Sequence, residues 1–185
     1  LHRRTVGATL GGVDFFMSHS WHDEPAGKWE ALSNFMTQHR TRHSNAEALL
    51  WFDRACINQQ KIDDSLSALP IYLAGCRGLL VLVGGTYTRR LWCILELFVF
   101  LQMGGAAERI TVLRLPNPDG TLEQQLATFE ALHAQCFKTD ERERLLAIIE
   151  TAFGSFDAFD VAVRGIFMSA SLGAPKGKRE KDERA

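Results

Sequence analysis

One carboxylate interrupts the most apolar stretch of the sequence. In residues 91–101 (LWCILELFVFL), ten of eleven residues are apolar and the exception is Glu96. A buried carboxylate without a partner has a raised pKa or costs several kcal/mol. Glu96 is therefore expected to have a partner, to open onto a cleft or to serve a function. A structural ion pair with Arg54, Arg89 or Arg90, or a place at the rim of the helix, remains an alternative.

Trp92 lies four residues before Glu96, so on a helix the two side chains project from the same face. A flat aromatic ring beside a carboxylate suits a planar cationic ring or a sugar, although a core tryptophan has the same spacing. Arg89 and Arg90 fall at the start of this helix, where the helix dipole attracts anions. They indicate either a phosphate-bearing ligand or an acidic partner, or they simply face solvent.

The segments that position these residues alternate between strands and helices. Apolar runs predict strands at 13–18, 49–53, 78–85 and 109–115, and helical periodicity predicts helices at 25–39, 66–73, 89–103, 121–136, 140–153 and onward to 167. The strand at 78–85 is apolar on both faces, which is typical of a parallel sheet covered on both sides. This order predicts an α/β fold with an open, doubly wound parallel sheet of four to five strands and helices on both faces.

Ligands of such sheets bind beyond the carboxyl ends of the strands. Residues 54–65 are expected to form a long, exposed loop at this edge. The polar and aromatic candidates that follow the predicted strands are Ser18, His19, Ser20, Trp21, Asp53, Arg54 and Tyr87.

Other chemistries have weaker support in the sequence. His19, His22 and Asp23 lie in one pentapeptide without a fourth ligand in view, so no metal site is expected. Cys93, or Cys56, with His19 could be imagined as a nucleophile and base, but Cys93 lies in an apolar helix, where cysteine usually behaves as a small hydrophobe. The sequence has neither the GxxxxGK[ST] loop nor the GxGxxG pattern of ordinary nucleotide-binding folds.

Composition narrows the class of protein further. The 185 residues carry a formal net charge of −1, which gives no electrostatic reason to expect a nucleic-acid partner. No apolar run is long enough to span a bilayer, and four widely spaced cysteines favour a reducing, intracellular (cytoplasmic) setting. We expect an N-terminal flank at 1–12, one domain at 13–167 and a charged flexible tail or linker at 168–185.

Several of these segments occur in the order typical of one protein family. VDFFMSHSWHD, WFD, GLLVLVGGTY and RRLWCILEL resemble the successive boxes of the Toll/interleukin-1 receptor (TIR) domain family across residues 13–115. The segment LLWFDRACINQQ is also similar to the WxDxxCINQ signature of heterokaryon-incompatibility domains.

The resemblance implies a flavodoxin-like domain that acts in innate-immune or cell-death signalling and self-associates through homotypic TIR contacts. Some TIR domains cleave NAD+ at the nicotinamide–ribose bond, with a glutamate in the position of Glu96. NAD+ would then be a substrate and no cofactor would be needed. By this resemblance Trp92 helps to shape the nicotinamide–ribose pocket. The remainder of the substrate site would be lined by Ser18, His19, Ser20, Trp21, Asp53, Arg54 and Tyr87.

Two other functions remain open. The chain could be a non-catalytic TIR-type interaction module, in which Glu96 and the loop at 54–65 serve packing and recognition. It could also be a flavodoxin-like module that binds another nucleotide or none. Turnover of NAD+ would separate the enzyme from the interaction module.

Overall fold

Four parallel strands form one open sheet at the centre of the molecule. The structure is a computed structural model that describes residues 5–56, 68–116, 121–136 and 138–172. The strands are arranged in the order β2-β1-β3-β4, and their bounds are β1 Val13–His19, β2 Leu50–Trp51, β3 Cys76–Val83 and β4 Ile110–Arg114. Every neighbouring pair is parallel. The predicted open parallel α/β sheet, consistent with a flavodoxin-like fold, is confirmed with four strands.

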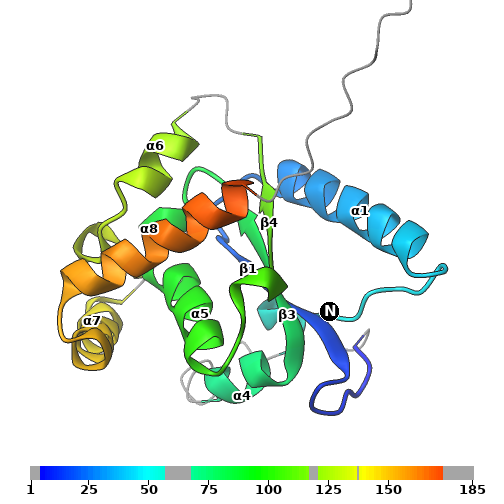
Figure 1. Cartoon of the computed structure of the whole chain (residues 1–185), viewed down its shortest axis with the longest axis horizontal. Coiled ribbons are helices and arrows are strands. Elements are labelled where there is room, and N and C mark those ends of the chain that lie inside the picture. Colours follow the sequence, from blue (N-terminus) through cyan, green and yellow to red (C-terminus); the bar gives the residue numbers. More distant parts are fainter. Residues whose placement is uncertain (1–4, 57–67, 117–120, 137, 173–185) are drawn as a thin grey trace, which may run out of the picture.

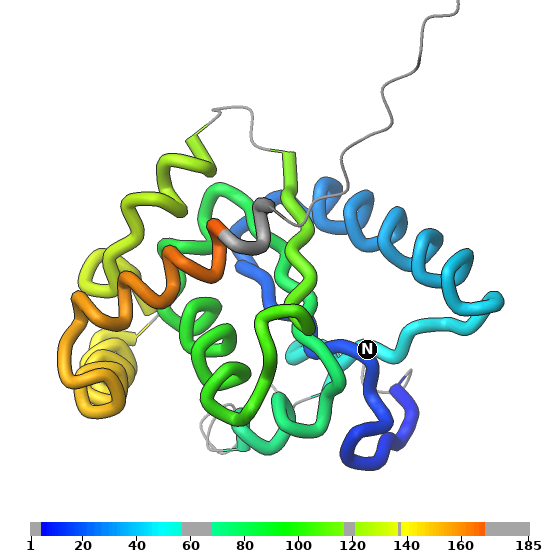
Figure 2. Tube along the Cα trace, in the orientation of Figure 1, coloured from blue at the N-terminus to red at the C-terminus, as the bar shows by residue number. Residues whose placement is uncertain are grey.

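Helices cover both faces of this sheet, but unequally (Figure 1). The helices are α1 Pro25–Arg42, α2 Asp53–Cys56, α4 Leu69–Ala74, α5 Leu91–Gln102, α6 Leu122–Ala127, α7 Thr139–Phe153 and α8 Phe156–Leu172. Short 3-10 turns lie at η2 Tyr87–Arg89, η3 Ala107–Arg109 and η4 Ala131–His133. Figure 2 shows α1 on one side of the sheet and the C-terminal helices α6 to α8 on the other.

Alternation along the strands divides the core into two parts. Successive strand residues point to opposite faces. Phe16 of β1 and Leu79 and Val81 of β3 therefore belong to the cluster that α4 to α8 cover, while Met17 and Leu80 belong to the cluster beneath α1. Because both faces of β3 are buried, the continuous apolar run predicted the right kind of strand.

The face beneath α1 has the thinner cover. None of the residues of α1 is fully buried, and its Leu32 and Phe35 are only partly buried against the sheet. Helix α5, in contrast, has seven buried residues, and its apolar circumference packs between the sheet and the C-terminal helices. The buried helix predicted around Glu96 is thus observed.

The helix predicted at 121–136 is wrong in its second half. Helix α6 ends at Ala127, and Phe129 turns into the core. Two side chains of α8 bind the backbone that follows, which is no longer α-helical: Asp160 Oδ1 accepts a hydrogen bond from Ala131 N at 2.8 Å, and Arg164 Nη1 donates to Phe129 O at 2.8 Å. Tertiary hydrogen bonds override local helical periodicity here.

The segment around β2 also differs from the prediction. The strand is only Leu50–Trp51 instead of 49–53, because the chain turns into α2 at Asp53. The amides of Ala55 and Cys56 donate to the carbonyl of Phe52, so the predicted loop at 54–65 begins with a helical turn. Residues 57–65 of that loop lie outside the described residues.

Helix α8 continues past residue 167, where the helical pattern was expected to end, to Leu172. Residues 173–185 of the predicted tail, and residues 1–4 of the predicted flank, lie outside the described residues. None of the helices in the described part of the chain is long and apolar enough to cross a membrane.

Candidate functional site

Glu96 is linked to the carboxyl-terminal end of β1 by a short hydrogen bond. Ser18 lies two residues after Phe16 in β1, so its side chain points to the same face of the sheet, toward α5. Its Oγ donates to Glu96 Oε2 at 2.6 Å. Tyr87 Oη lies 2.7 Å from the same Ser18 Oγ. The sequence-predicted residues Ser18, Tyr87 and Glu96 are therefore brought together. Ser18 and Tyr87 have no exposed surface, and Glu96 is half-buried.

The surroundings of Glu96 favour its protonated form. Burial raises the pKa of Glu96 from 4.5 to about 8, and the negative charge of Asp53 adds to this rise. The hydrogen bond from Ser18 acts in the opposite direction. In the described part of the chain Glu96 forms no ion pair, so the alternative of a partner arginine is not what is observed. Arg89 is exposed, and the backbone of Arg90 forms a bridge with Gln135.

Three predicted residues gather at the exposed rim beside Glu96. The indole of Trp21 is 46% exposed, and its Nε1 donates to Asp53 Oδ2 at 2.9 Å. The guanidinium of Arg54 lies 5.2 Å from the centre of the Trp21 ring. Burial raises the pKa of Asp53, although the amide of Arg54 and the indole of Trp21 donate to its carboxylate. The rim thus combines an aromatic surface, a carboxylate and a cation.

His19 is held in its neutral form. Its ring lies 5.1 Å from that of Phe52, and burial lowers its pKa from 6.5 to about 4, with a further contribution from the positive charge of Lys28. Within the described residues, no group of three or more His, Cys, Asp or Glu side chains could hold a metal ion. A neutral His19 can donate or accept one hydrogen bond at the site without adding charge.

A clamp of polar side chains joins the β1–α1 loop to the loop after β3. Asp23 Oδ1 accepts from Thr86 N at 2.9 Å and from Thr86 Oγ1 at 2.7 Å, and Ser20 Oγ lies 2.7 Å from Thr86 Oγ1. Lys28 Nζ donates to Ser20 O at 2.9 Å. A Cβ on Gly84 would come within 2.5 Å of the Asp23 carboxylate, so the clamp needs glycine there.

This clamp changes the interpretation of Ser20. Only 1% of Ser20 is exposed, so in this conformation the hydroxyl holds the loop instead of facing a ligand. Sequence reasoning weighed Asp23 only as a metal ligand and missed its role in the clamp. The glycine pair Gly84–Gly85 directly after β3 was the available signal, since glycine in such a position often permits close approach of another group.

Trp92 is the predicted site residue with the least support. It is half-buried and packs against the edge of the core that α5 covers. Trp92 lies one helical turn before Glu96, so the two side chains share one face of α5. A role of Trp92 in a ligand pocket stays a prediction.

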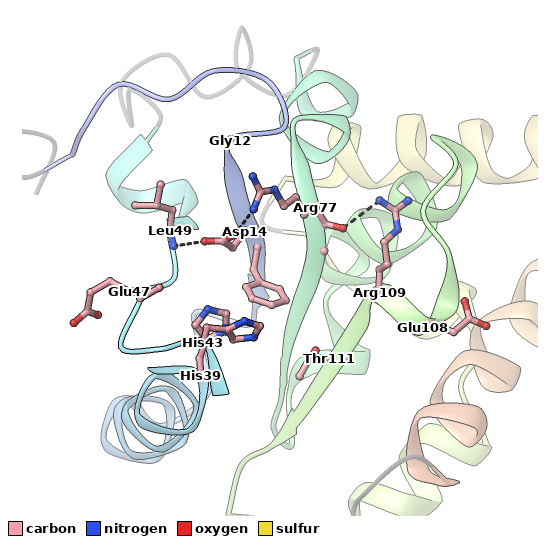
Figure 3. Close-up of a pocket in the computed structure, with 13 residues that line it drawn as sticks. Gly12, Asp14, His39, His43, Glu47, Leu49, Arg77, Glu108, Arg109 and Thr111 are labelled. Carbon is pink, nitrogen blue, oxygen red and sulfur yellow. Dashed lines mark hydrogen bonds and ion pairs between the residues drawn. The ribbon is translucent and has the colours of Figure 1, made fainter. Parts of the chain in front are cut away.

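A groove of about 680 Å³ lies at the opposite edge of the sheet, where the strands begin (Figure 3). In Figure 3, Asp14 accepts from the amide of Leu49 and pairs with Arg77, and Arg109 donates to the carbonyl of Arg77. His39 of α1 lines this groove together with residues at the starts of the strands. The groove contains none of the predicted site residues, and sequence reasoning did not anticipate it.

Comparisons with models of known protein families and with curated protein sequences gave no match. The fold and the geometry around Glu96 therefore carry the functional conclusion.

Proposed function

We propose that the chain is a TIR-like intracellular signalling domain that cleaves the nicotinamide–ribose bond of NAD+, with Glu96 as the catalytic carboxylate. The observation that carries this proposal is a half-buried glutamate with a raised pKa at the carboxyl edge of a parallel sheet, where ligands of such folds bind. The sequence resemblance to the TIR family supports the same residue. NAD+ is a substrate in this proposal and no cofactor takes part.

The reaction needs few groups. Nicotinamide is bound as a cationic pyridinium, so when the C1′–N1 bond breaks it takes both electrons and leaves as a neutral molecule without a general acid. The ribose then carries an oxocarbenium-like charge, which the Glu96 carboxylate stabilises. The oxygen of a water molecule forms the new bond to C1′ and releases a proton, which gives ADP-ribose. Other glycosidases need a second carboxylic acid for a neutral leaving oxygen.

The rim residues suit the rest of a dinucleotide. The exposed indole of Trp21 offers a stacking surface for a base, and the guanidinium of Arg54 beside it can pair with a phosphate. Asp53 holds Trp21 in place by accepting from its indole. A pyridinium ring next to Glu96 would also favour the ionised carboxylate, since a nearby positive charge lowers the pKa of an acid.

Glu96→Gln tests this proposal, with Glu108→Gln as the matched control. Glu108 is an exposed glutamate that borders the groove at the other edge of the sheet. Nicotinamide release from NAD+ is measured for all three proteins, both in dilute solution and concentrated on a surface to force self-association. We expect turnover in the wild type and in Glu108→Gln and none in Glu96→Gln. Equal turnover in Glu96→Gln would refute the assignment.

A non-catalytic interaction module is the second candidate. The exposed apolar side chains favour it, because Trp29 is 71%, Val161 62% and Met168 65% exposed. A folded wild type that self-associates but releases no nicotinamide in either state would support this second function. Loss of association in Trp29→Ser, with unchanged folding, would then identify the contact surface.

A further inference from the structure

Four oxygen atoms form a continuous row from Glu96 into the core. Glu96 Oε2 lies 2.6 Å from Ser18 Oγ, Ser18 Oγ lies 2.7 Å from Tyr87 Oη, and Tyr87 Oη lies 3.1 Å from the carbonyl oxygen of Cys93. All three separations are hydrogen-bond distances. Because Ser18 and Tyr87 have no exposed surface, bulk solvent cannot satisfy their hydroxyl groups.

The ionised state of Glu96 leaves this row one hydrogen short. A carboxylate only accepts, so Ser18 must donate its single hydrogen to Glu96. Tyr87 then donates its single hydrogen either to Ser18 or to the carbonyl of Cys93. Two hydrogens thus serve three contacts, and one pair of oxygen atoms faces each other without a hydrogen between them.

The protonated state of Glu96 completes the row. Glu96 donates to Ser18, Ser18 donates to Tyr87, and Tyr87 donates to the carbonyl of Cys93, so three hydrogens serve three contacts. The Glu96–Ser18 bond is the reverse of that in the ionised state, and so is the Ser18–Tyr87 bond when the phenol of the ionised state donates to Ser18. Protonation of Glu96 and the direction of the row are therefore coupled.

We propose that Ser18 and Tyr87 form a reversible hydrogen-bond relay and that Tyr87, which is fully buried, is a positioning residue that holds Glu96 in its protonated form. When Glu96 ionises, the Tyr87 hydroxyl rotates from the Cys93 carbonyl to Ser18, and the relay loses one hydrogen bond. The relay thereby sets how much of the carboxylate is available for the reaction.

The charged groups around Glu96 act in addition to the relay. Asp53 on α2 opposes the ionisation of Glu96. Cys93 lies on α5, as Glu96 does, and burial together with the charge of Glu96 raises the pKa of its thiol. Farther groups, Lys28 on α1 and Arg54 on α2, act on Asp53 with the opposite sign. All of these groups are unchanged in a Tyr87→Phe variant, so the difference in pKa between that variant and the wild type measures the relay.

The test is a titration of the Glu96 carboxyl carbon by NMR in Tyr87→Phe, without NAD+. Loss of the phenol removes two hydrogen bonds from the protonated form but only one from the ionised form. The relay therefore predicts that the pKa of Glu96 falls by about 0.5 to 1 unit, or about three- to tenfold in its acid dissociation constant. If Tyr87 only donated toward the carboxylate, the pKa would rise. A rise or no change overturns the proposal.

A second background shows whether the effect passes through Ser18. In Ser18→Ala the row is cut, so adding Tyr87→Phe should leave the pKa of Glu96 unchanged. An equal fall with and without Ser18 would contradict the relay.

Incorporated 3-fluorotyrosine keeps the ring in place if Tyr87→Phe fails to fold. The other tyrosine, Tyr72, is first replaced by phenylalanine so that only position 87 carries fluorine. Fluorine makes the phenol a weaker acceptor and a stronger donor, so the relay predicts a fall in the pKa of Glu96 that disappears in Ser18→Ala. A rise, no change, or an equal fall without Ser18 would contradict the relay.

The relay rests on the same carboxylate as the proposed function, but its titration uses no substrate. If Tyr87→Phe lowers the pKa of Glu96 but the wild type does not turn over NAD+, the proposed enzyme activity is refuted and the relay stands. If the wild type turns over NAD+ but Tyr87→Phe leaves the pKa of Glu96 unchanged, the relay is refuted and the proposed activity stands.

Discussion

Replacing Glu96 by glutamine should stabilise the folded chain in alkaline solution and leave its stability in mild acid almost unchanged. The pKa of Glu96 is raised from 4.5 to about 8 in the folded state. Below 4.5 the carboxyl is protonated in both the folded and the unfolded state. Between the two values only the unfolded state ionises, so the stability of the wild type falls as pH rises and levels off above about 8.

The magnitude follows from the size of this shift. A rise of about 3.5 units corresponds to an upper limit of about 5 kcal/mol at high pH. Because Glu96 is only half-buried and glutamine can still accept from Ser18, we expect Glu96→Gln to gain about 2–4 kcal/mol at about pH 9 and less than about 1 kcal/mol at about pH 5. For a domain of this size, the gain at pH 9 is a rise in Tm of about 5–15 °C.

Thermal and urea unfolding at both pH values measure this difference. Glu108→Gln is the control, because Glu108 is exposed and its replacement should give the same small change at both pH values. A Glu96→Gln variant that is less stable than the wild type at pH 9, or that gains equally at both, would refute the idea that burial opposes the charge of Glu96.

Two further predictions concern the segments that hold the site. Gly84→Ala should destabilise the fold by about 2 kcal/mol or more, because the new methyl group meets the Asp23 carboxylate, while Gly85→Ala, whose Cβ meets nothing within 4 Å, should stay within about 1 kcal/mol in urea unfolding. Equal effects of the two would contradict the clamp. His19 has its pKa lowered to about 4, so stability should fall as pH drops from 6.5 to about 4, by up to about 3 kcal/mol. His19→Asn should flatten this loss, and an unchanged acid profile would show that His19 is not its source.

The sequence predicted the sheet and the glutamate within an apolar helix well because both depend on hydrophobic pattern. Strand β3 is apolar on both faces, and a single Glu96 within α5 stands out against its neighbours. Three of the residues singled out beyond the strands, Trp21, Asp53 and Arg54, contact one another at one rim, while their role in binding a ligand stays a prediction. These features follow from periodicity and from the topology of parallel sheets.

What the sequence could not predict depends on contacts between distant segments. The backbone after α6 leaves its helical pattern because Asp160 and Arg164 of α8 bind it. The partner of Glu96 is Ser18 and not an arginine. Side chains alternate along β1, and this alternation places the Ser18 hydroxyl on the face that α5 covers. The clamp of Asp23 over Gly84 joins loops far apart in the chain, and local propensity carries no signal for such contacts.

The pH dependence of kcat/KM for nicotinamide release tests the central claim most directly. The proposed reaction needs the ionised carboxylate of Glu96, and kcat/KM reports the pKa of the free protein. We therefore predict that kcat/KM rises about tenfold per pH unit in acid and becomes level above about 8, the pKa of Glu96. A profile that is flat across this range or falls as pH rises, or the absence of turnover, would contradict the claim that Glu96 is the reacting carboxylate.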